Sequence, residues 1–283
     1  MEIKKVGVVG CGVMGAGITQ VCAQSGYQVV VSEINDKLLN KGLASINSVL
    51  TRSVDKGEIS PQDKESILTR IKGTINTQDF HDRDLIIEAA VENMDLKKKI
   101  FTEVDKICPK HTILATNTSC LSIIDMAMIT SRPDKVLGLH FFNPVSVMTI
   151  VEIVKTIATS DETLETGKTF GKSLGKNIVI AQDTPGFIVN RLWIPFVLDA
   201  ARMLETGITT KEDIDTGIHL GLNHPMGPLA LADLIGLDTI MFIADAIYEE
   251  LKDPHYAVPP LWKRMFTAGH LGRKTGKGFY DYE

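Results

Sequence analysis

Residues 5–33 read KVGVVGCGVMGAGITQVCAQSGYQVVVSE and predict a strand, a turn, a helix and a second strand. Lys5–Val9 is a short apolar strand, Ala16–Ser25 is an apolar helix that Gly26 ends, and Gln28–Val31 is the next strand. Between the first strand and the helix stands G-x-G-x-x-G, which in this setting is typical of a dinucleotide site. The stretch therefore predicts an α/β, Rossmann-type doubly wound fold with a mostly parallel sheet.

The glycines of this loop each have a physical reason. Gly10 permits the tight turn, Gly12 lets the backbone approach a pyrophosphate, and Gly15 allows the helix to pack closely on the strand. The N-terminus of the helix offers unpaired N–H groups to the anion. We expect cofactor contacts along the whole loop, at Gly10, Gly12, Val13, Met14 and Gly15.

Glu33 follows the second strand, about 20 residues after the loop. Its carboxylate can accept both hydroxyls of an adenosine ribose, and its charge repels a 2′-phosphate, which favours NAD over NADP. A glycine turn beside a solvated glutamate is the alternative. Because the loop, its flanks and the acid agree, the cofactor site is the preferred interpretation.

Lys37–Lys72 reads as two amphipathic helices that meet at Gly57. They interrupt the alternation of strand and helix, so we expect the pair to project from the sheet. Arg52 and Lys56 lie in this pair. They either form a solvated helix face or meet the phosphates of a large anionic substrate.

Polar groups follow five predicted strands of the first part of the chain. In open α/β sheets ligands lie outside the carboxyl ends of the strands, so groups at those ends should converge on one edge. A serine after a strand is usually a helix cap when it stands alone. The convergence makes a site the better interpretation. The groups are Gly10–Gly15, Glu33, Glu92, Asn117–Ser119 and His140–Asn143.

Two apolar runs, Val136–Phe142 and Val147–Val154, predict strands separated by the turn residues Asn143-Pro144. Each run carries one ionisable side chain that a buried strand seldom keeps, His140 in the first and Glu152 in the second. If the runs pair, the two side chains can meet as an acid–base couple. A core histidine is the alternative, and its place at the cofactor edge makes that less favoured.

Asp95–Ile107 is a predicted helix with Lys97, Lys98 and Lys99 in its first turns. The helix dipole disfavours positive charge there. The three lysines indicate either a solvated helix end or an anion site, and the sequence does not decide between them.

Beyond Asp183–Gly186 only helical segments follow, so we place a boundary near residue 184. We expect an NAD-binding domain over 1–184 and a smaller all-α domain over 185–283 for dimerisation and substrate binding. The apolar surface of the second domain favours a homodimer. Gly272–Gly278 is expected to be flexible and basic, either as a solvated tail or with Lys274 reaching back to the cofactor.

The composition is that of a globular protein, with 283 residues, 44% hydrophobic and 23% charged residues and a formal net charge of −5. The acidic balance argues against a nucleic-acid partner. The N-terminus MEIKK runs straight into a strand, so no signal peptide is expected, and no apolar run reaches the roughly 20 residues of a membrane span. The four cysteines lack metal spacing and read as buried thiols. A cytoplasmic protein without a metal is expected.

The chain resembles the L-3-hydroxyacyl-CoA dehydrogenases over essentially its whole length, most closely the short bacterial members that act on 3-hydroxybutyryl-CoA. GLHFFNP together with DTPGFIVNR carries the resemblance most specifically, and the glycine loop alone fits many dehydrogenases. The matching segments are GCGVMGAGI at Gly10–Ile18, EAAVEN at Glu88–Asn93, TNTSCLS at Thr116–Ser122, GLHFFNPVSVM at Gly138–Met148, DTPGFIVNR at Asp183–Arg191, HPMGPL at His224–Leu229 and GRKTGKGFYDY at Gly272–Tyr282.

The resemblance implies NAD-dependent hydride transfer at C3 of a short-chain 3-hydroxyacyl-CoA or acetoacetyl-CoA. It implies a catalytic His140 oriented by Glu152, with Ser119 and Asn190 polarising the substrate. Coenzyme A would meet a basic residue of the projecting helices, Lys56 or less closely Arg52. Related proteins are homodimers. The implied cofactor contacts are the glycine loop, Glu33, Glu92, Lys97, Ser119, Asn143 and Lys274, to which the strand-end pattern adds Asn117.

Two other functions fit part of this pattern. A dehydrogenase of a free hydroxy acid or sugar acid would share the site chemistry without needing a nucleotide-binding helix. A non-catalytic NAD-binding protein would not need His140, Glu152, Ser119 and Asn190 together, and their presence argues against it.

Overall fold

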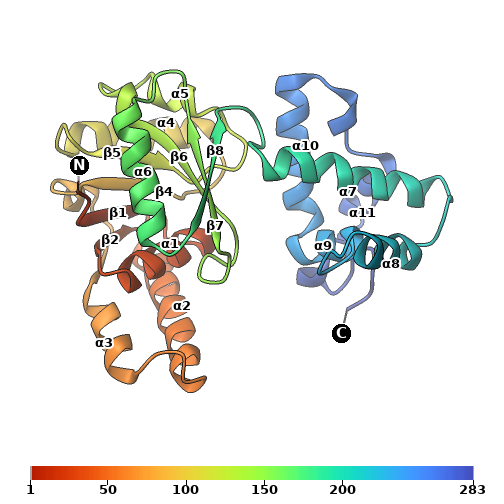
Figure 1. Cartoon of the computed structure of the whole chain (residues 1–283), viewed down its shortest axis with the longest axis horizontal. Helices are drawn as coiled ribbons and strands as arrows, with labels where there is room; N and C mark the ends of the chain where they lie inside the picture. Colours follow the sequence, from red (N-terminus) through yellow and green to blue (C-terminus); the bar gives the residue numbers. More distant parts are fainter. Residues whose placement is uncertain (1, 283) are drawn as a thin grey trace. The chain divides into compact units, whose positions relative to one another are not determined.

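The computed structural model describes residues 2–282. The chain divides between Thr184 and Pro185 into two compact units. Figure 1 shows a sheet flanked by helices before this point and helices alone after it. The α/β fold class predicted from the sequence is confirmed, with its mostly parallel sheet and its smaller all-α part.

The sheet of the first unit has eight strands in the order β3-β2-β1-β4-β5-β6-β7-β8. Neighbours pair in parallel except β6 and β7, which are antiparallel. The strands β1, β4, β5 and β6 are almost completely buried, as expected of strands covered on both faces by helices. The bounds are β1 (Lys5–Val9), β2 (Gln28–Ser32), β3 (Ile71–Thr74), β4 (Leu85–Glu88), β5 (Ile113–Thr116), β6 (Val136–Phe141), β7 (Ile150–Lys155) and β8 (Asn177–Gln182).

The helices of the first unit begin at side-chain caps in most cases. Asn35 caps α2 by accepting from Leu38 N, and Ser60 with Asp63 forms a reciprocal capping box at α3. Figure 1 shows α2 and α3, in orange, extending beyond the sheet as the sequence predicts. The bounds are α1 (Val13–Gln24), α2 (Asp36–Asp55), α3 (Pro61–Thr69), α4 (Met94–Ile107), α5 (Ile123–Ala127) and α6 (Asp161–Ser173).

The prediction of helix through Lys72 is wrong at its end. The chain leaves α3 at Thr69 and forms β3, in which Ile71 pairs with Val29 of β2 in parallel. Only Thr74 of this edge strand is buried, and Lys72 is exposed. A four-residue edge strand has too little apolar periodicity to be separated from a helix end by its sequence.

The second unit consists of helices. Gly236, at a φ of +107°, separates α9 from α10. Trp262 is completely buried, and its indole N–H donates to the Leu237 carbonyl at 3.0 Å. The bounds are α7 (Val189–Glu205), α8 (Lys211–Gly221), α9 (Pro228–Ile235), α10 (Leu237–Leu251) and α11 (Pro260–Thr267).

The expectation of a flexible tail at Gly272–Gly278 is wrong, because this segment packs on Asp233. The buried Asp233 carboxylate accepts from the Phe279 and Tyr280 N–H groups and from the Tyr282 hydroxyl, each at 2.9 Å. A charge buried in this way needs several donors. The residues directly after the segment supply them, and the segment itself packs against Asp233 and is closed by the hydrogen bond from the Gly272 N–H to the Lys277 carbonyl at 2.8 Å. Within residues 2–282, no helix is both long enough and apolar enough to cross a membrane.

Candidate active site

The carboxyl ends of five strands lie at one edge of the sheet. The strands β2, β1, β4, β5 and β6 are consecutive neighbours, all parallel. The loop Gly10–Gly15, Glu33, Glu92, Asn117–Ser119 and His140 therefore come from adjacent strand ends, which is where an open α/β sheet binds its ligands.

The glycine loop has the shape that a pyrophosphate requires. Gly10 has a φ of +97°, and a Cβ there would lie 2.8 Å from the Ala89 carbonyl oxygen. A Cβ on Gly15 would lie 1.9 Å from the Gly10 carbonyl oxygen, so α1 could not approach β1 with any larger residue. A Cβ on Gly12 would meet nothing within 4 Å. Gly10 and Gly15 allow the loop and α1 to pack closely on β1 and β4, whereas Gly12 leaves open space in front of the loop. The residues present therefore fit a dinucleotide.

Glu33 directly follows β2, and its carboxylate is hydrogen-bonded to the glycine loop. One carboxylate oxygen accepts from the Cys11 N–H at 2.9 Å and the other accepts from the Ile34 N–H at 2.9 Å. The acid is thereby fixed beside the loop. This is the position from which a carboxylate binds a ribose and repels a 2′-phosphate.

His140 and Glu152 occupy opposed positions on β6 and β7. The Nδ1 atom of His140 lies 2.6 Å from the Glu152 carboxylate, and Nε2 lies 3.1 Å from the Ser119 hydroxyl oxygen. Both side chains are buried, Glu152 completely. The Phe142 ring lies at 4.6 Å between centroids from the imidazole. One imidazole nitrogen is thus held by a carboxylate while the other is directed at a hydroxyl.

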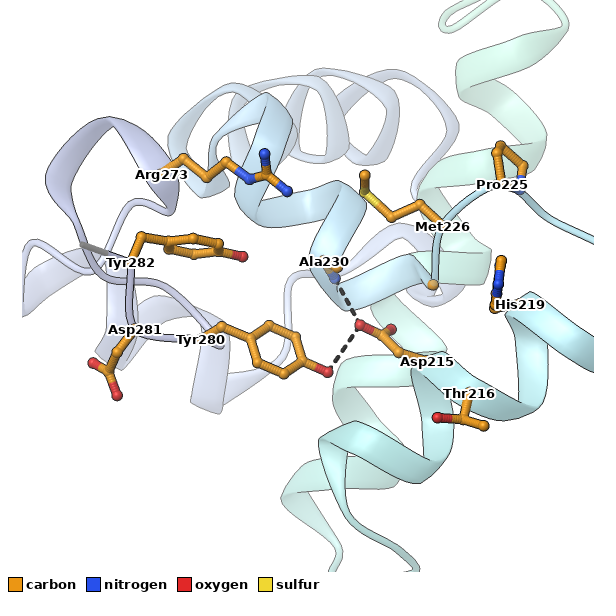
Figure 2. Close-up of a pocket in the computed structure, with 11 residues that line it drawn as sticks. Asp215, Thr216, His219, Pro225, Met226, Ala230, Arg273, Tyr280, Asp281 and Tyr282 are labelled. Carbon is orange, nitrogen blue, oxygen red and sulfur yellow. Dashed lines mark hydrogen bonds between the residues drawn. The ribbon is translucent and has the colours of Figure 1, made fainter.

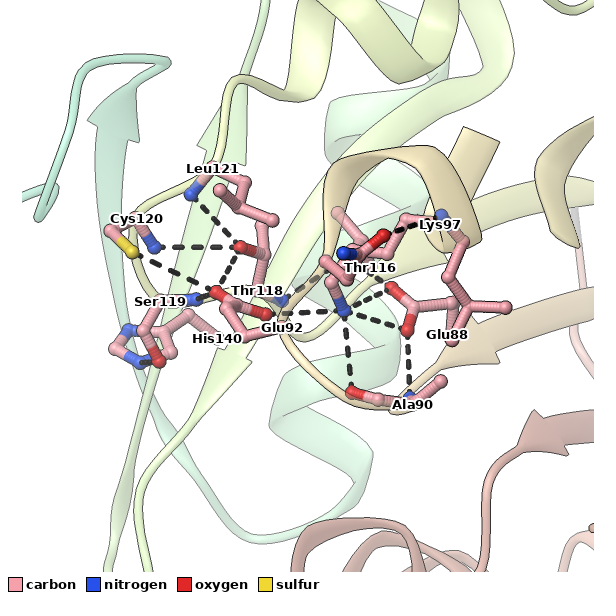
Figure 3. Close-up of polar contacts among 12 residues, drawn as sticks. Glu88, Ala90, Glu92, Lys97, Thr116, Thr118, Ser119, Cys120, Leu121 and His140 are labelled. Atoms are coloured by element: carbon pink, nitrogen blue, oxygen red, sulfur yellow. Dashed lines mark hydrogen bonds and ion pairs between the residues drawn. The ribbon is translucent and has the colours of Figure 1, made fainter. Parts of the chain in front are cut away.

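Ser119 is held in place by Glu92 (Figure 3). The Glu92 carboxylate accepts from the Ser119 N–H at 2.8 Å and from the Thr118 hydroxyl. On the other side, the Asn117 side-chain oxygen accepts from the Phe141 N–H at 2.9 Å and ties β5 to β6 next to His140. The predicted cofactor contacts Glu92 and Asn117 therefore also shape the surroundings of the histidine.

For Lys97, Lys98 and Lys99 the sequence left two alternatives, a solvated helix end or an anion site. Lys97 instead forms a buried ion pair within the protein. Its side chain is only 1% exposed and donates to both oxygens of Glu88, at 2.7 and 2.8 Å, with Glu92 at 3.2 Å. The sequence interpretation missed Glu88. The available signal was an acidic residue inside the apolar run 84–91, the same signal that singled out His140 and Glu152.

Three further predicted residues of the first unit, Arg52, Lys56 and Asn143, are exposed. Arg52 and Lys56 are exposed at the end of α2, and the nearest acid to Lys56 is Glu58 at 4.0 Å. Asn143 is exposed in the loop after β6. In the second unit, Asn190 lies in the first turn of α7 and is partly buried.

Lys274, in a short 3₁₀ turn of the second unit, forms an ion pair with Asp238.

A pocket of about 490 Å³ lies in the second unit (Figure 2). Its lining includes Asp215, His219, Arg273, Tyr280 and Tyr282 and none of the predicted site residues. The Asp215 carboxylate is already used by the fold, because it accepts from the N–H groups at the start of α9 and from the Tyr280 hydroxyl at 2.9 Å. The candidate site is therefore the strand edge of the first unit.

Comparison with known proteins agrees with this geometry. A family model described as 3-hydroxyacyl-CoA dehydrogenase, NAD binding domain, matches residues 5–184. A second, described as 3-hydroxyacyl-CoA dehydrogenase, C-terminal domain, matches residues 186–282. Together they account for almost the whole chain, and their border falls where the two compact units divide.

Individual relatives are similar over their full length. A 3-hydroxybutyryl-CoA dehydrogenase of Mycobacterium tuberculosis is 45% identical over 99% of this chain and 99% of its own. One of Clostridioides difficile is 46% identical over 98% and 99%. Among solved structures, the (S)-3-hydroxybutyryl-CoA dehydrogenase of Ralstonia eutropha has a TM-score of 0.96 at 45% identity, and M. tuberculosis FadB2 has 0.98 at 44%. Each covers 100% of both chains.

Proposed function

The chain belongs to the 3-hydroxyacyl-CoA dehydrogenase family, and on that basis we propose that it is an (S)-3-hydroxybutyryl-CoA dehydrogenase. It is an NAD-dependent oxidoreductase. The proposed reaction interconverts the C3 hydroxyl of a short-chain 3-hydroxyacyl-CoA and the C3 ketone of acetoacetyl-CoA. Support for the short chain comes from relatives named for that substrate that cover nearly all of this chain.

We propose that the cofactor binds at the edge of the sheet where the carboxyl ends of the five strands lie. NAD, when bound, supplies the acceptor or donor of the hydride. Gly12 leaves room for the pyrophosphate, and Glu33 is held beside the loop for the ribose. The full set of proposed contacts is Gly10, Gly12, Val13, Met14, Gly15, Glu33, Glu92, Lys97, Asn117, Ser119, Asn143 and Lys274.

His140 is the proposed acid–base residue, and the contact of its Nδ1 with Glu152 carries the proposal. That contact, at 2.6 Å, fixes the ring, with Nε2 directed at the Ser119 hydroxyl. Nε2 can then take the proton of the substrate hydroxyl in oxidation and return it to the same oxygen in reduction. Glu152 stabilises the imidazolium that forms, as a buried carboxylate does for other catalytic histidines.

Ser119 and Asn190 are the proposed polarising groups. The Ser119 hydroxyl lies 3.1 Å from Nε2, so an oxygen that exchanges a proton with His140 can also reach this hydroxyl. Asn190 is assigned by its match to the family motif DTPGFIVNR. Lys56, or less closely Arg52, is the proposed contact of the coenzyme A phosphates, since both are exposed on the projecting helices.

The test of this function is substrate-dependent oxidation of NADH. Acetoacetyl-CoA should be reduced, whereas free acetoacetate at the same concentration should not. In the reverse direction the (S) isomer of 3-hydroxybutyryl-CoA should reduce NAD and the (R) isomer should not. Equal rates with free acetoacetate would favour a hydroxy-acid dehydrogenase, and no turnover with either would favour a non-catalytic NAD-binding protein.

The assembly and location of the enzyme belong to the same proposal. We place the dimer interface in the second unit, where large apolar side chains are exposed on several helices. The four cysteines are all buried free thiols, which suits a reducing cytoplasm.

A further inference from the structure

Glu88 is the centre of a buried polar network beneath the Ser119 loop, defined here as residues 117–122 (Figure 3). It is the last residue of β4 and is completely buried. One carboxylate oxygen accepts from the Ala90 N–H at 2.7 Å, and the other accepts from the Thr116 hydroxyl at 2.6 Å. Lys97 donates to both oxygens. A carboxylate with this many donors is held firmly in one orientation.

Two routes lead from Glu88 to the Ser119 loop. In the first, Lys97 also contacts Glu92 at 3.2 Å, and Glu92 accepts from the Ser119 N–H. In the second, the Thr116 hydroxyl donates to Glu88 and accepts from the Thr118 N–H at 3.1 Å. Both routes end at the residue that contacts His140 Nε2 or at its neighbour.

The charges of this network make its parts interdependent. Glu88 and Glu92 share the ammonium of Lys97, which is buried, so each carboxylate limits how closely the other can hold it. If Glu88 loses its charge, Lys97 has Glu92 as its remaining carboxylate partner in the network. Glu92 is then drawn toward Lys97 and away from the Ser119 N–H.

From these contacts we propose that Glu88 is a positioning residue for the reaction. Through Lys97 and Glu92 on one side and Thr116 on the other, it keeps the Ser119 hydroxyl against His140. The proposal rests on the roles proposed above for Ser119 and His140. It also gives Lys97 a role in the protein's own structure, separate from any contact with the cofactor.

The test uses substitutions that remove single links. Glu88→Gln removes the charge with little change in volume. Thr116→Val removes only the hydroxyl and keeps all charges, and Thr116→Ser restores the hydroxyl. Asp105→Asn is the matched control, because Asp105 forms another, partly buried ion pair of the same unit, with Arg132 at 2.7 Å, and its described side-chain hydrogen bonds go to Ser131 and Arg132, outside the Ser119 loop.

Cys120 provides a readout that does not depend on activity. It lies next to Ser119, is 3% exposed, and its thiol contacts the Glu92 carboxylate at 3.8 Å. Burial raises the pKa of this thiol, so it reacts slowly while the loop is closed. Cys22 is completely buried in α1 and reports global unfolding. Labelling of each cysteine with N-ethylmaleimide, followed by peptide mass spectrometry, separates local opening from global unfolding.

We expect Glu88→Gln and Thr116→Val to lower kcat for acetoacetyl-CoA by about tenfold or more, because misplacement of a group at the reacting centre by about 1 Å has effects of this size. The Kd of NADH should change by a smaller factor than kcat. Cys120 labelling should rise relative to Cys22 labelling. The kcat and the Cys120 labelling rate of Thr116→Ser should be much closer to those of the wild type than the values of Thr116→Val. Asp105→Asn should leave both quantities unchanged.

Three results would overturn the proposal. One is an unchanged kcat in both Glu88→Gln and Thr116→Val. Another is Cys120 labelling that rises only in step with Cys22, which would mark Glu88 as a general stabiliser. The third is weaker NADH binding with an unchanged kcat, which would assign the network to the cofactor. If Glu88→Gln does not fold, the kcat and the cysteine labelling of Thr116→Val and Thr116→Ser test the proposal instead. If the wild type reduces no acyl-CoA, the proposed function fails while the labelling still shows whether Glu88 holds the loop.

Discussion

His140 and Glu152 are direct register partners across the antiparallel pair β6–β7, and their side chains meet at 2.6 Å. Side chains alternate between the faces of a strand, so a slip of one residue would put Glu152 on the opposite face from His140. The pairing is fixed by two buried strands instead of by a mobile loop. We therefore expect activity to be insensitive to substitutions elsewhere in the two strands and to be lost when either His140 or Glu152 is replaced.

Replacement of the pair should affect chemistry more than cofactor binding. We expect His140→Gln to lower kcat by several orders of magnitude and Glu152→Gln by about 10²–10⁴, the range found when the carboxylate partner of a catalytic histidine is neutralised. The Kd of NADH, measured by fluorescence, should change little. Glu162→Gln, at an exposed position of α6, serves as the control and should behave as the wild type. Near-normal turnover of His140→Gln would remove His140 from the mechanism.

Gly12 and Gly15 should respond differently to alanine. Gly12 has a φ of −69° and open space around a Cβ, so Gly12→Ala should keep its thermal stability but bind NADH at least about tenfold more weakly, roughly 1.4 kcal/mol. Gly15→Ala should instead lower the free energy of unfolding by about 1–3 kcal/mol through overpacking. Gly217→Ala is the control, because a Cβ on Gly217 is also unhindered and this residue lies in the second unit. Normal NADH affinity of Gly12→Ala would contradict the site.

Glu33 should set the preference between the two nicotinamide cofactors. Glu33→Gln keeps an acceptor for one of the two backbone N–H groups but removes the charge that repels a 2′-phosphate. We expect the ratio of kcat/KM for NADH over NADPH to fall by about tenfold or more, since one charge interaction of this kind is worth roughly 1–2 kcal/mol. Asp36→Asn removes a neighbouring charge at the start of α2 and should leave the ratio unchanged.

Much of the site could be predicted because local signals were sufficient. The strand, glycine loop and helix at residues 5–24 specify one another within a short stretch of sequence. His140 and Glu152 each stand out as a single ionisable residue in an apolar run, and their pairing needs only a hairpin. Both features depend on contacts between segments close in the sequence.

Glu88 and Lys97 show why the rest could not be predicted. Glu88 also interrupts an apolar run, but its partners Lys97 and Thr116 come from α4 and β5, and they meet it only after β4 and β5 have paired. The lysine looked unfavourable at a helix N-terminus, and the structure offsets that cost with two carboxylates. Which acid a buried lysine meets is decided by tertiary packing, which sequence periodicity does not report.

Asp82 should contribute stability that is lost in acid. Burial acts to raise the pKa of Asp82, but hydrogen bonds and charges from Lys5 and Arg83 outweigh it and lower the pKa to about 2, from an ordinary value of 3.8. A folded pKa below the unfolded one gives stability that is complete above about pH 4 and is lost as the pH falls towards 2. Because the carboxylate is partly exposed, we expect Asp82→Asn to lower the free energy of unfolding by only about 1 kcal/mol at pH 7.

Urea unfolding at several pH values tests this expectation. The difference between wild type and Asp82→Asn should shrink between pH 4 and the lowest pH at which the protein still folds. In a Lys5→Met background the effect of Asp82→Asn should be smaller at pH 7, because the ion pair at 2.7 Å is already gone. A difference that stayed constant with pH would exclude a contribution from the Asp82 charge.

Leu220 and Leu222, at the end of α8, are 72% and 59% exposed and are the natural place to test the proposed dimer interface. Burying a leucine side chain contributes about 1.5–3 kcal/mol, and a two-fold interface contains each residue twice. Leu220→Glu should therefore weaken dimerisation by at least about a hundredfold. Ile157→Glu, at a 97% exposed position of the first unit, is the matched control and should leave the dimer intact. Sedimentation equilibrium measures both, and if only Ile157→Glu dissociated the dimer, the interface would have to be moved to the first unit.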